Sequence, residues 1–76
     1  MKTYFFPIII EKDEDGYTAC CPALQGCYTQ GDSYEEVMEN INDAIRLHLE
    51  DREAEKEDIP PPRSLSVSTV AVTFGE

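Results

Sequence analysis

Apolar and polar positions along the first twenty residues predict two short strands joined by a turn. Residues 3–12 carry apolar side chains on both faces of a strand, so we expect both faces to be buried. Because Pro7 has no backbone N–H, we expect either that the well-paired part of this strand begins at Ile8 or that Pro7 marks a bulge or an exposed edge. Asp15–Gly16 is a hairpin turn signal between two apolar runs, and residues 16–21 return as the second strand.

A third strand follows after a second turn. Pro22 ends the preceding strand, and Gly26 supplies the freedom of φ that the turn needs. Residues 27–30 are long enough for a short strand before Gly31 and Asp32 break it. Three consecutive strands joined by short connections predict an antiparallel meander.

The pattern then changes to helical spacing over residues 34–56. Ser33 followed three residues later by Glu36 is a capping box, in which each side chain satisfies a free backbone N–H of the other residue. Polar and charged residues fall on the opposite face of this helix. The apolar stripe comprises Tyr34, Val37, Met38, Ile41, Ala44, Ile45, His48 and Leu49.

The end of the chain predicts a connector and a final strand. The sequence IPPPR, residues 59–63, stops the helix and is stiff and extended. In the strand expected over residues 65–74, the apolar positions shift from one face to the other near Ser68. This shift predicts either a bulge or burial on both sides, as in a strand that also pairs with another subunit. We therefore expect a homo-oligomer, a dimer or a tetramer, whose interface includes Val67, Val70, Val72 and Phe74.

The order of elements predicts an α+β fold in one domain, residues 1–76. The order is β-β-β-α-β, with the helix packed on the sheet. The fourth strand is expected beside the first and parallel to it, because a right-handed crossover through the helix would place it there.

Charge narrows the classes of partner. The 76 residues include sixteen acidic and six basic side chains, a net charge of −10. Such a chain would repel phosphates, which argues against direct binding of nucleic acid. A basic protein is a better partner, although net charge also keeps small proteins soluble.

No apolar run is long enough for a membrane span. An odd count of three cysteines without a secretory signal predicts free thiols in a reducing cytoplasm.

The cysteines raise the question of metal or redox chemistry. Cys20, Cys21 and Cys27 lie within eight positions, and His48 could supply a fourth ligand. Adjacent cysteines on a strand point to opposite faces, however, so Cys20 and Cys21 do not easily bind one ion. No C-x-x-C pair is present. Buried or half-buried strand thiols are the preferred interpretation, and no cofactor is expected.

Carboxylates raise two further alternatives. The sequence EKDEDG, residues 11–16, resembles the start of an EF-hand loop, but its twelfth position is Pro22 in place of the bidentate glutamate. A metal-dependent hydrolase using Asp13, Asp15 and Asp32 would need acids that converge from strand interiors. These acids lie at turns instead, so an enzyme is not expected.

Four segments, DEDGYTACCPALQGC, GDSYEEV, NINDAIRLHLE and IPPPR, together resemble the HicB family of antitoxins. The resemblance covers residues 4 to about 72. Ala23, Gln25, Ser33 and Val37 depart from the commonest residues of the family pattern. The residues that match it are Gly16, Tyr17, Pro22, Leu24, Gly26, Cys27, Gly31, Asp32, Glu35, Glu36, Ala44, Ile59 and Pro60.

The resemblance implies a partial ribonuclease H-like fold without an active site, and a role as an inhibitor. Its partner would be a HicA toxin, a small ribonuclease that degrades mRNA through a histidine, and the antitoxin would mask that histidine and the basic RNA surface. Many members carry a C-terminal DNA-binding module, which we do not expect here because the sequence stops shortly after Phe74. The alternative is an interaction or ligand-sensing domain of the same fold without a toxin. For the partner surface we favour the outer helix face and then the acidic turn, namely Glu35, Glu39, Asp43, Arg46 and Glu50, with Asp13 and Asp15.

Overall fold

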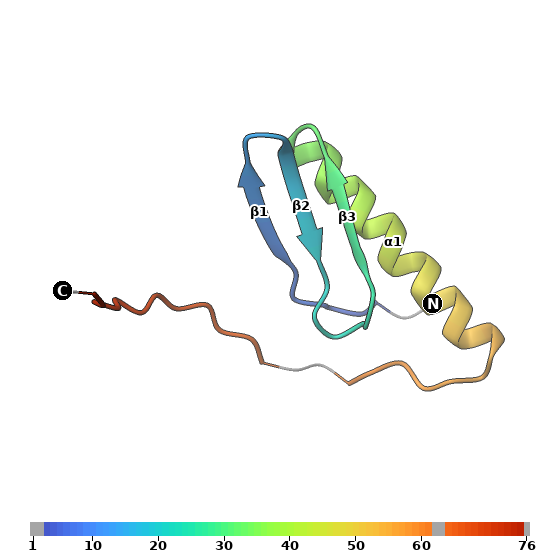
Figure 1. The fold of residues 1–76 in the computed structure, drawn as a ribbon. Helices are drawn as coiled ribbons and strands as arrows, with labels where there is room; N and C mark the ends of the chain where they lie inside the picture. Colours follow the sequence, from blue (N-terminus) through green and yellow to red (C-terminus); the bar gives the residue numbers. More distant parts are fainter. Residues whose placement is uncertain (1–2, 62–63, 76) are drawn as a thin grey trace.

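A computed structural model describes residues 3–61 and 64–75, and over these ranges it contains a three-stranded antiparallel sheet and one long helix (Figure 1). The strands are β1 (Ile9–Asp13), β2 (Gly16–Cys20) and β3 (Tyr28–Gly31), in the spatial order β1-β2-β3. The helix α1 (Tyr34–Ala54) packs across β2 and β3. The meander and the packing of the helix on the sheet are therefore confirmed.

The strand register divides the sheet into a covered and an open face. Ile10 lies opposite Ala19, which lies opposite Thr29, and Ala19 is buried beneath the helix. The alternate positions, Cys20 and its neighbour Tyr28, point to the face that the helix leaves open. Tyr28 is accordingly 75% exposed.

The core is small and lies between β2, the turn after it and the first half of α1. The turn over residues 21–27 is closed by three backbone hydrogen bonds, including Cys21 N–H to the carbonyl of Cys27 at 2.9 Å. This turn folds back over the end of the sheet and inserts Leu24, whose exposed fraction is 1%. The buried side chains are Ala19, Cys21, Leu24, Cys27, Val37 and Ile41.

The helix begins as the sequence predicts and approaches β3 closely. The hydroxyl of Ser33 accepts a hydrogen bond from the N–H of Glu36 at 3.1 Å, which confirms Ser33 as the N-cap and one of the two hydrogen bonds of the predicted capping box. A Cβ atom at Gly31 would lie only 2.7 Å from the backbone nitrogen of Val37. Glycine at position 31 thus lets the first turn of α1 lie directly against the end of β3.

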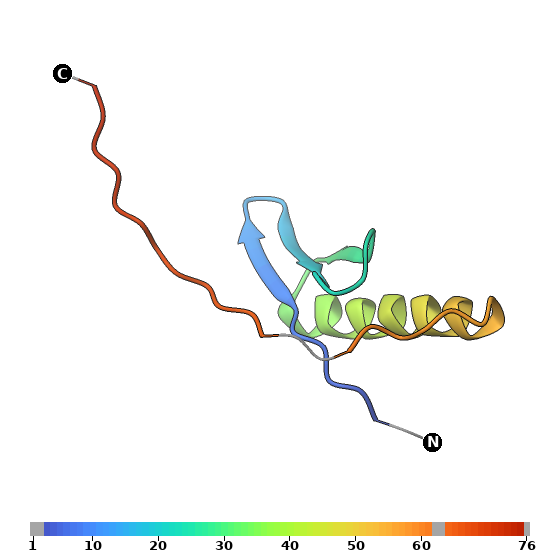
Figure 2. The same ribbon diagram turned by 90° about the horizontal axis from the view of Figure 1, so that it is seen from below.

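Two expectations about strands differ from the structure. The first strand was expected over residues 3–12, but β1 begins at Ile9, because Pro7 lacks the N–H needed to extend the ladder. The fourth strand, expected over residues 65–74, is not formed in the described part of this single chain. Residues 64–75 are instead extended, exposed and directed away from the sheet and the helix (Figures 1 and 2). A strand requires a ladder partner, and none of the residues that the structure describes pairs with this segment.

Candidate interaction surface

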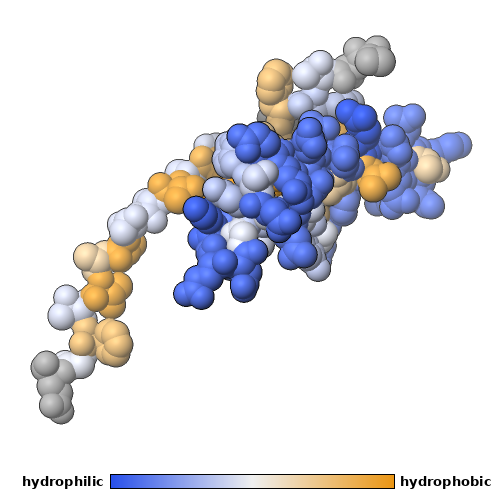
Figure 3. Space-filling view, turned by 90° about the horizontal axis from the view of Figure 1, so that it is seen from above, coloured by the Kyte–Doolittle hydropathy of each residue, from blue (hydrophilic) through white to orange (hydrophobic). Residues whose placement is uncertain are grey.

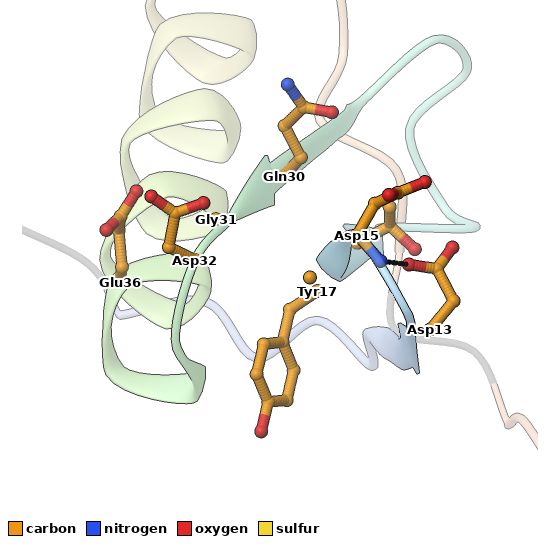
Figure 4. A pocket seen from close by; sticks show the side chains of 9 residues that line it. Asp13, Asp15, Tyr17, Gln30, Gly31, Asp32 and Glu36 are labelled. Atoms are coloured by element: carbon orange, nitrogen blue, oxygen red, sulfur yellow. Dashed lines mark hydrogen bonds between the residues drawn. The ribbon is translucent and has the colours of Figure 1, made fainter.

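Carboxylates from two distant parts of the sequence gather at one end of the fold. Asp13 and Asp15, from the β1–β2 turn, and Asp32 and Glu36, from the start of α1, line a hollow of about 570 Å³ (Figure 4). Tyr17 and Gln30 also line it, and the four acidic side chains are exposed to solvent. We call these four residues the acidic cluster. Figure 3 shows the molecule from this end, where the surface of the body is predominantly hydrophilic.

Local hydrogen bonding and helix geometry hold the acidic cluster in place. The carboxylate of Asp13 accepts a hydrogen bond from the N–H of Asp15 at 2.8 Å, which fixes the turn. Gly16 has φ of +132°, a conformation that few other residues adopt, so the turn leads directly into β2. Glu36 lies in the first turn of α1, where the positive end of the helix dipole favours negative charge.

The outer face of α1 extends this acidic surface along the molecule. All five predicted helix residues are exposed and project on the side opposite Val37 and Ile41, which are buried. The predicted positions span roughly 22 Å from first to last, at 1.5 Å per residue. Arg46 lies among them and donates a hydrogen bond to the side chain of Asn42 at 3.5 Å. The five residues are Glu35, Glu39, Asp43, Arg46 and Glu50.

The structure brings together some of the predicted residues and not others. Asp13, Asp15 and Glu35 line one hollow beside the turn, whereas Glu50 lies towards the far end of α1. The prediction of the partner surface did not include Asp32 and Glu36, which complete the acidic cluster. Tyr17 pairs with Gly31, so the start of β2 lies beside the end of β3. A prediction of this register would have placed Asp32 and Glu36 close to the β1–β2 turn.

The arrangement of potential ligands does not form a metal centre within the residues that the structure describes. No three His, Cys, Asp or Glu side chains of this part of the chain are placed to hold one ion. Cys20 and Cys21 point to opposite sides of the sheet, the first half-buried and the second 1% exposed. All three cysteines are free thiols.

Burial separates the cysteines by reactivity. The pKa of the Cys27 thiol is raised, chiefly by desolvation and further by the neighbouring Cys21 and Cys20. A raised pKa leaves less of the reactive thiolate at neutral pH, so Cys27 should be alkylated slowly. We expect iodoacetamide to modify Cys20 first in the folded protein, and Cys21 and Cys27 only after unfolding, as followed by tandem mass spectrometry. Equal labelling of all three in guanidinium is the control, and modification of Cys27 as fast as Cys20 in the folded protein would contradict this arrangement.

The open face of the sheet provides a second, less polar surface. Ile9, Cys20 and Tyr28 lie beside Thr18 and Gln30 around a shallow hollow of about 400 Å³. It carries one acidic side chain, Glu11, in contrast to the acidic cluster. Among the residues described, no helix is both long and apolar enough to cross a membrane.

Comparison with known proteins is consistent across sequence and structure. The family model for HicB-like antitoxins of bacterial toxin–antitoxin systems matches residues 6–75. A UPF0150 protein of Synechocystis is 45% identical over 60 residues, covering 78% of this chain and 76% of the relative. A UPF0150 protein of Archaeoglobus fulgidus is 42% identical over 71 residues, covering 92% of this chain and 97% of the relative.

A solved structure agrees with the sequence relatives. A chain of the HicA3 and HicB3 toxin–antitoxin complex superposes with a TM-score of 0.65 and is 28% identical in sequence. The match covers 78% of this chain and 70% of that one. The matched family model covers nearly all of the chain, including the turn that builds the acidic cluster and the helix that follows it. The protein therefore belongs to the family of HicB-like antitoxins of bacterial toxin–antitoxin systems.

Proposed function

We propose that this protein is an antitoxin that binds a basic, HicA-type mRNA-cleaving toxin and masks its RNA-binding surface and catalytic histidine. The observation that carries the proposal is the likeness, in fold and in sequence, to a chain of the HicA3 and HicB3 complex. The protein acts by stoichiometric binding and catalyses no reaction of its own. It works in the cytoplasm, where the toxin would meet mRNA.

The acidic surface gives this proposal a physical mechanism. A ribonuclease attracts RNA by placing cationic side chains against phosphates. The acidic cluster and the outer face of α1 offer the toxin carboxylates in place of those phosphates, within a chain whose net charge is −10. Complementary potentials of this kind mainly raise the rate of association and exclude wrong partners.

The proposal includes the complete fold of the family. A fourth strand beside β1 would extend the sheet to four strands and give the partial ribonuclease H-like arrangement that the resemblance implies. β1 is the edge strand of the described sheet and has room for such a neighbour.

Charge reversal on the outer helix face tests the proposal. Glu39→Lys with Asp43→Lys replaces two exposed carboxylates that lie one helical turn apart. We expect the rate of association with a catalytically inactive HicA-type toxin to fall roughly tenfold at low salt, measured by stopped-flow fluorescence. The difference should shrink as the salt concentration rises.

The matched control is Glu55→Lys with Glu57→Lys, two exposed carboxylates beyond the end of α1. It changes the net charge by the same amount but lies away from the proposed surface, so its association rate should fall much less. Equal effects of the two variants would show that only net charge matters. A wild-type protein that neither binds the toxin nor protects RNA from it would refute the proposed function itself.

A further inference from the structure

The described chain exposes far more surface than a folded protein of its size should. It exposes 6669 Å², whereas a folded monomer of 8.6 kDa is expected to expose about 4,700 Å². Its radius of gyration is 15.4 Å, against about 11 Å for a compact chain of this length. The extended segment 64–75 adds to this exposure, because all of its residues are exposed and none of them belongs to the core. We call this segment the C-terminal arm.

The C-terminal arm has the composition of a strand and not of a solvated tail. Residues 64–74 include three valines, two threonines and a phenylalanine, which favour strands, together with three serines, and they contain neither proline nor glycine. It holds no charged residue, in a protein where charged side chains are frequent elsewhere. Most of its large side chains are nevertheless in water: Val67 is 82% exposed and Phe74 is 92% exposed, while Leu65 is 39% exposed. Figure 3 shows this as a line of hydrophobic side chains leading away from the hydrophilic body.

The sheet offers one edge that suits such a strand. The outer edge of β1 has no partner in the described chain, so half of its backbone donors and acceptors face outwards. The opposite edge, at β3, is approached by α1, where the side chain of Asn40 donates a hydrogen bond to the carbonyl of Gln30 at 2.8 Å. β1 is therefore the edge at which a further strand can be added.

The side of β1 that faces the helix layer is also incompletely covered. α1 packs over β2 and β3 and does not reach β1, so Ile8 and Ile10 are only half-buried (Figure 2). A strand added at this edge would place the side chains of one of its faces beside Ile8 and Ile10, in the space that α1 leaves uncovered. Val70, Val72 and Phe74 share a face of the C-terminal arm and match these isoleucines in polarity.

We propose that two copies of this chain form a dimer by reciprocal exchange of the C-terminal arm, which pairs with β1 of the second copy. The apolar and uncharged character of the C-terminal arm lets two otherwise acidic molecules meet along it without strong repulsion. Exchange of identical segments between copies is a low-cost route to a symmetric dimer. The proposal does not depend on the toxin.

The connection after α1 explains why the acceptor is a second copy. The N–H of Glu57 donates to the carbonyl of Arg52 at 2.7 Å, and the guanidinium of Arg52 donates to the carbonyl of Asp58 at 3.1 Å. Ile59 and Pro61 then line a hollow with Tyr4 of the N-terminal segment. The two hydrogen bonds hold the chain against the end of the helix over residues 52–58, and the sequence that follows contains three consecutive prolines, which are stiff. The C-terminal arm leads away from its own β1 (Figures 1 and 2).

The area available is sufficient for a stable dimer. The excess exposure is roughly 2,000 Å² for each chain. Stable interfaces bury about 1,200–2,000 Å² in total over both partners. Burial of less than half of the excess on each chain would therefore suffice.

The first test measures mass and shape together. We expect light scattering after size exclusion to give a dimer at micromolar concentrations, and hydrogen exchange to show protected amides over residues 66–74. Dilution through the dimer transition should remove this protection. A wild-type protein that is monomeric would overturn the proposal. X-ray scattering would then distinguish two cases: a radius of gyration near 11 Å would mean that the C-terminal arm pairs within its own chain. A value of 15.4 Å would mean that the C-terminal arm remains free.

A matched pair of variants tests the strand itself. Val70→Pro removes a backbone donor from the centre of the C-terminal arm without adding charge, and should weaken dimerisation at least tenfold. Val70→Thr keeps a β-branched side chain and the donor, and should leave a dimer. The helical signal in circular dichroism should be the same for both, because residue 70 lies outside the core. A Val70→Pro protein that dimerises like the wild type would show that the dimer forms through another surface.

Discussion

Replacing Leu24 with alanine is expected to lower the free energy of unfolding by about 2–5 kcal/mol, a large share of the stability of so small a domain. Leu24 is 1% exposed and is among the largest side chains that are fully buried. It enters the core from the turn over residues 21–27, whose hydrogen bonds involve backbone atoms and would survive the substitution. The loss is therefore that of apolar burial, with a cavity left where the side chain had been.

Leu47→Ala is the matched control for Leu24→Ala, because it removes the same atoms from a leucine that is 65% exposed. Alanine also favours helix formation, so this variant should change stability little. Thermal denaturation followed by circular dichroism, at one fixed protein concentration, should give a melting temperature at least about 8 °C lower for Leu24→Ala, since each kcal/mol lowers it by about 4–8 °C in a domain of this size. Similar melting temperatures for the two variants would mean that Leu24 does not close the core.

The helix could be predicted almost to its ends because its signals are local. Ser33 and Glu36 lie within one turn, and one of the two hydrogen bonds of the predicted capping box, from the N–H of Glu36 to the hydroxyl of Ser33, is present at 3.1 Å. The sequence predicted an end near residue 56, and α1 ends at Ala54. The apolar stripe has finished by that point, so the final turns have no packing to hold them.

The assembly of the acidic cluster could not be predicted in the same way. Asp13 and Asp32 are far apart in the sequence and meet because Tyr17 pairs with Gly31. That register depends on the turn and on the packing of the helix, and a slip of one residue would reverse every side chain of a strand. The outer helix face was simpler to predict, since helical spacing alone places Glu39 and Asp43 away from the sheet.

The final strand shows a different limit of prediction from sequence. The pattern of residues 65–74 favours a strand, but a strand pattern does not say which chain supplies its ladder partner. In the single chain this segment is unpaired and exposed. Val67, Val70, Val72 and Phe74 thus remain the predicted oligomer interface, and their exposure in one copy is what reciprocal exchange requires.

Replacing Gly31 with alanine is expected to destabilise the fold by about 1–3 kcal/mol, although the change adds one methyl group. The new Cβ would lie 2.7 Å from the nitrogen and 3.0 Å from the Cα of Val37. Both atoms belong to the backbone of α1, so no rotation of a side chain can relieve the contact, and the helix must move away from β3. Because Val37 is itself fully buried, that movement loosens the core as well as the acidic cluster beside it.

Gly26→Ala separates this steric effect from the conformational preference of glycine. Gly26 has φ of +78° and no atom within 4 Å of the position of a Cβ, so alanine there meets backbone strain alone. Gly31 has no positive φ, so alanine there meets only the contact with α1. Urea unfolding of both variants should show a loss of about 1 kcal/mol for Gly26→Ala and an equal or greater loss for Gly31→Ala.

Gly31→Ala should also change the chemical shifts of Val37 and Glu36 in NMR spectra. A Gly31→Ala protein with wild-type stability and unchanged shifts would mean that α1 does not lie against β3 as closely as the structure shows, and the spacing between Asp13 and Glu36 would then have to be larger.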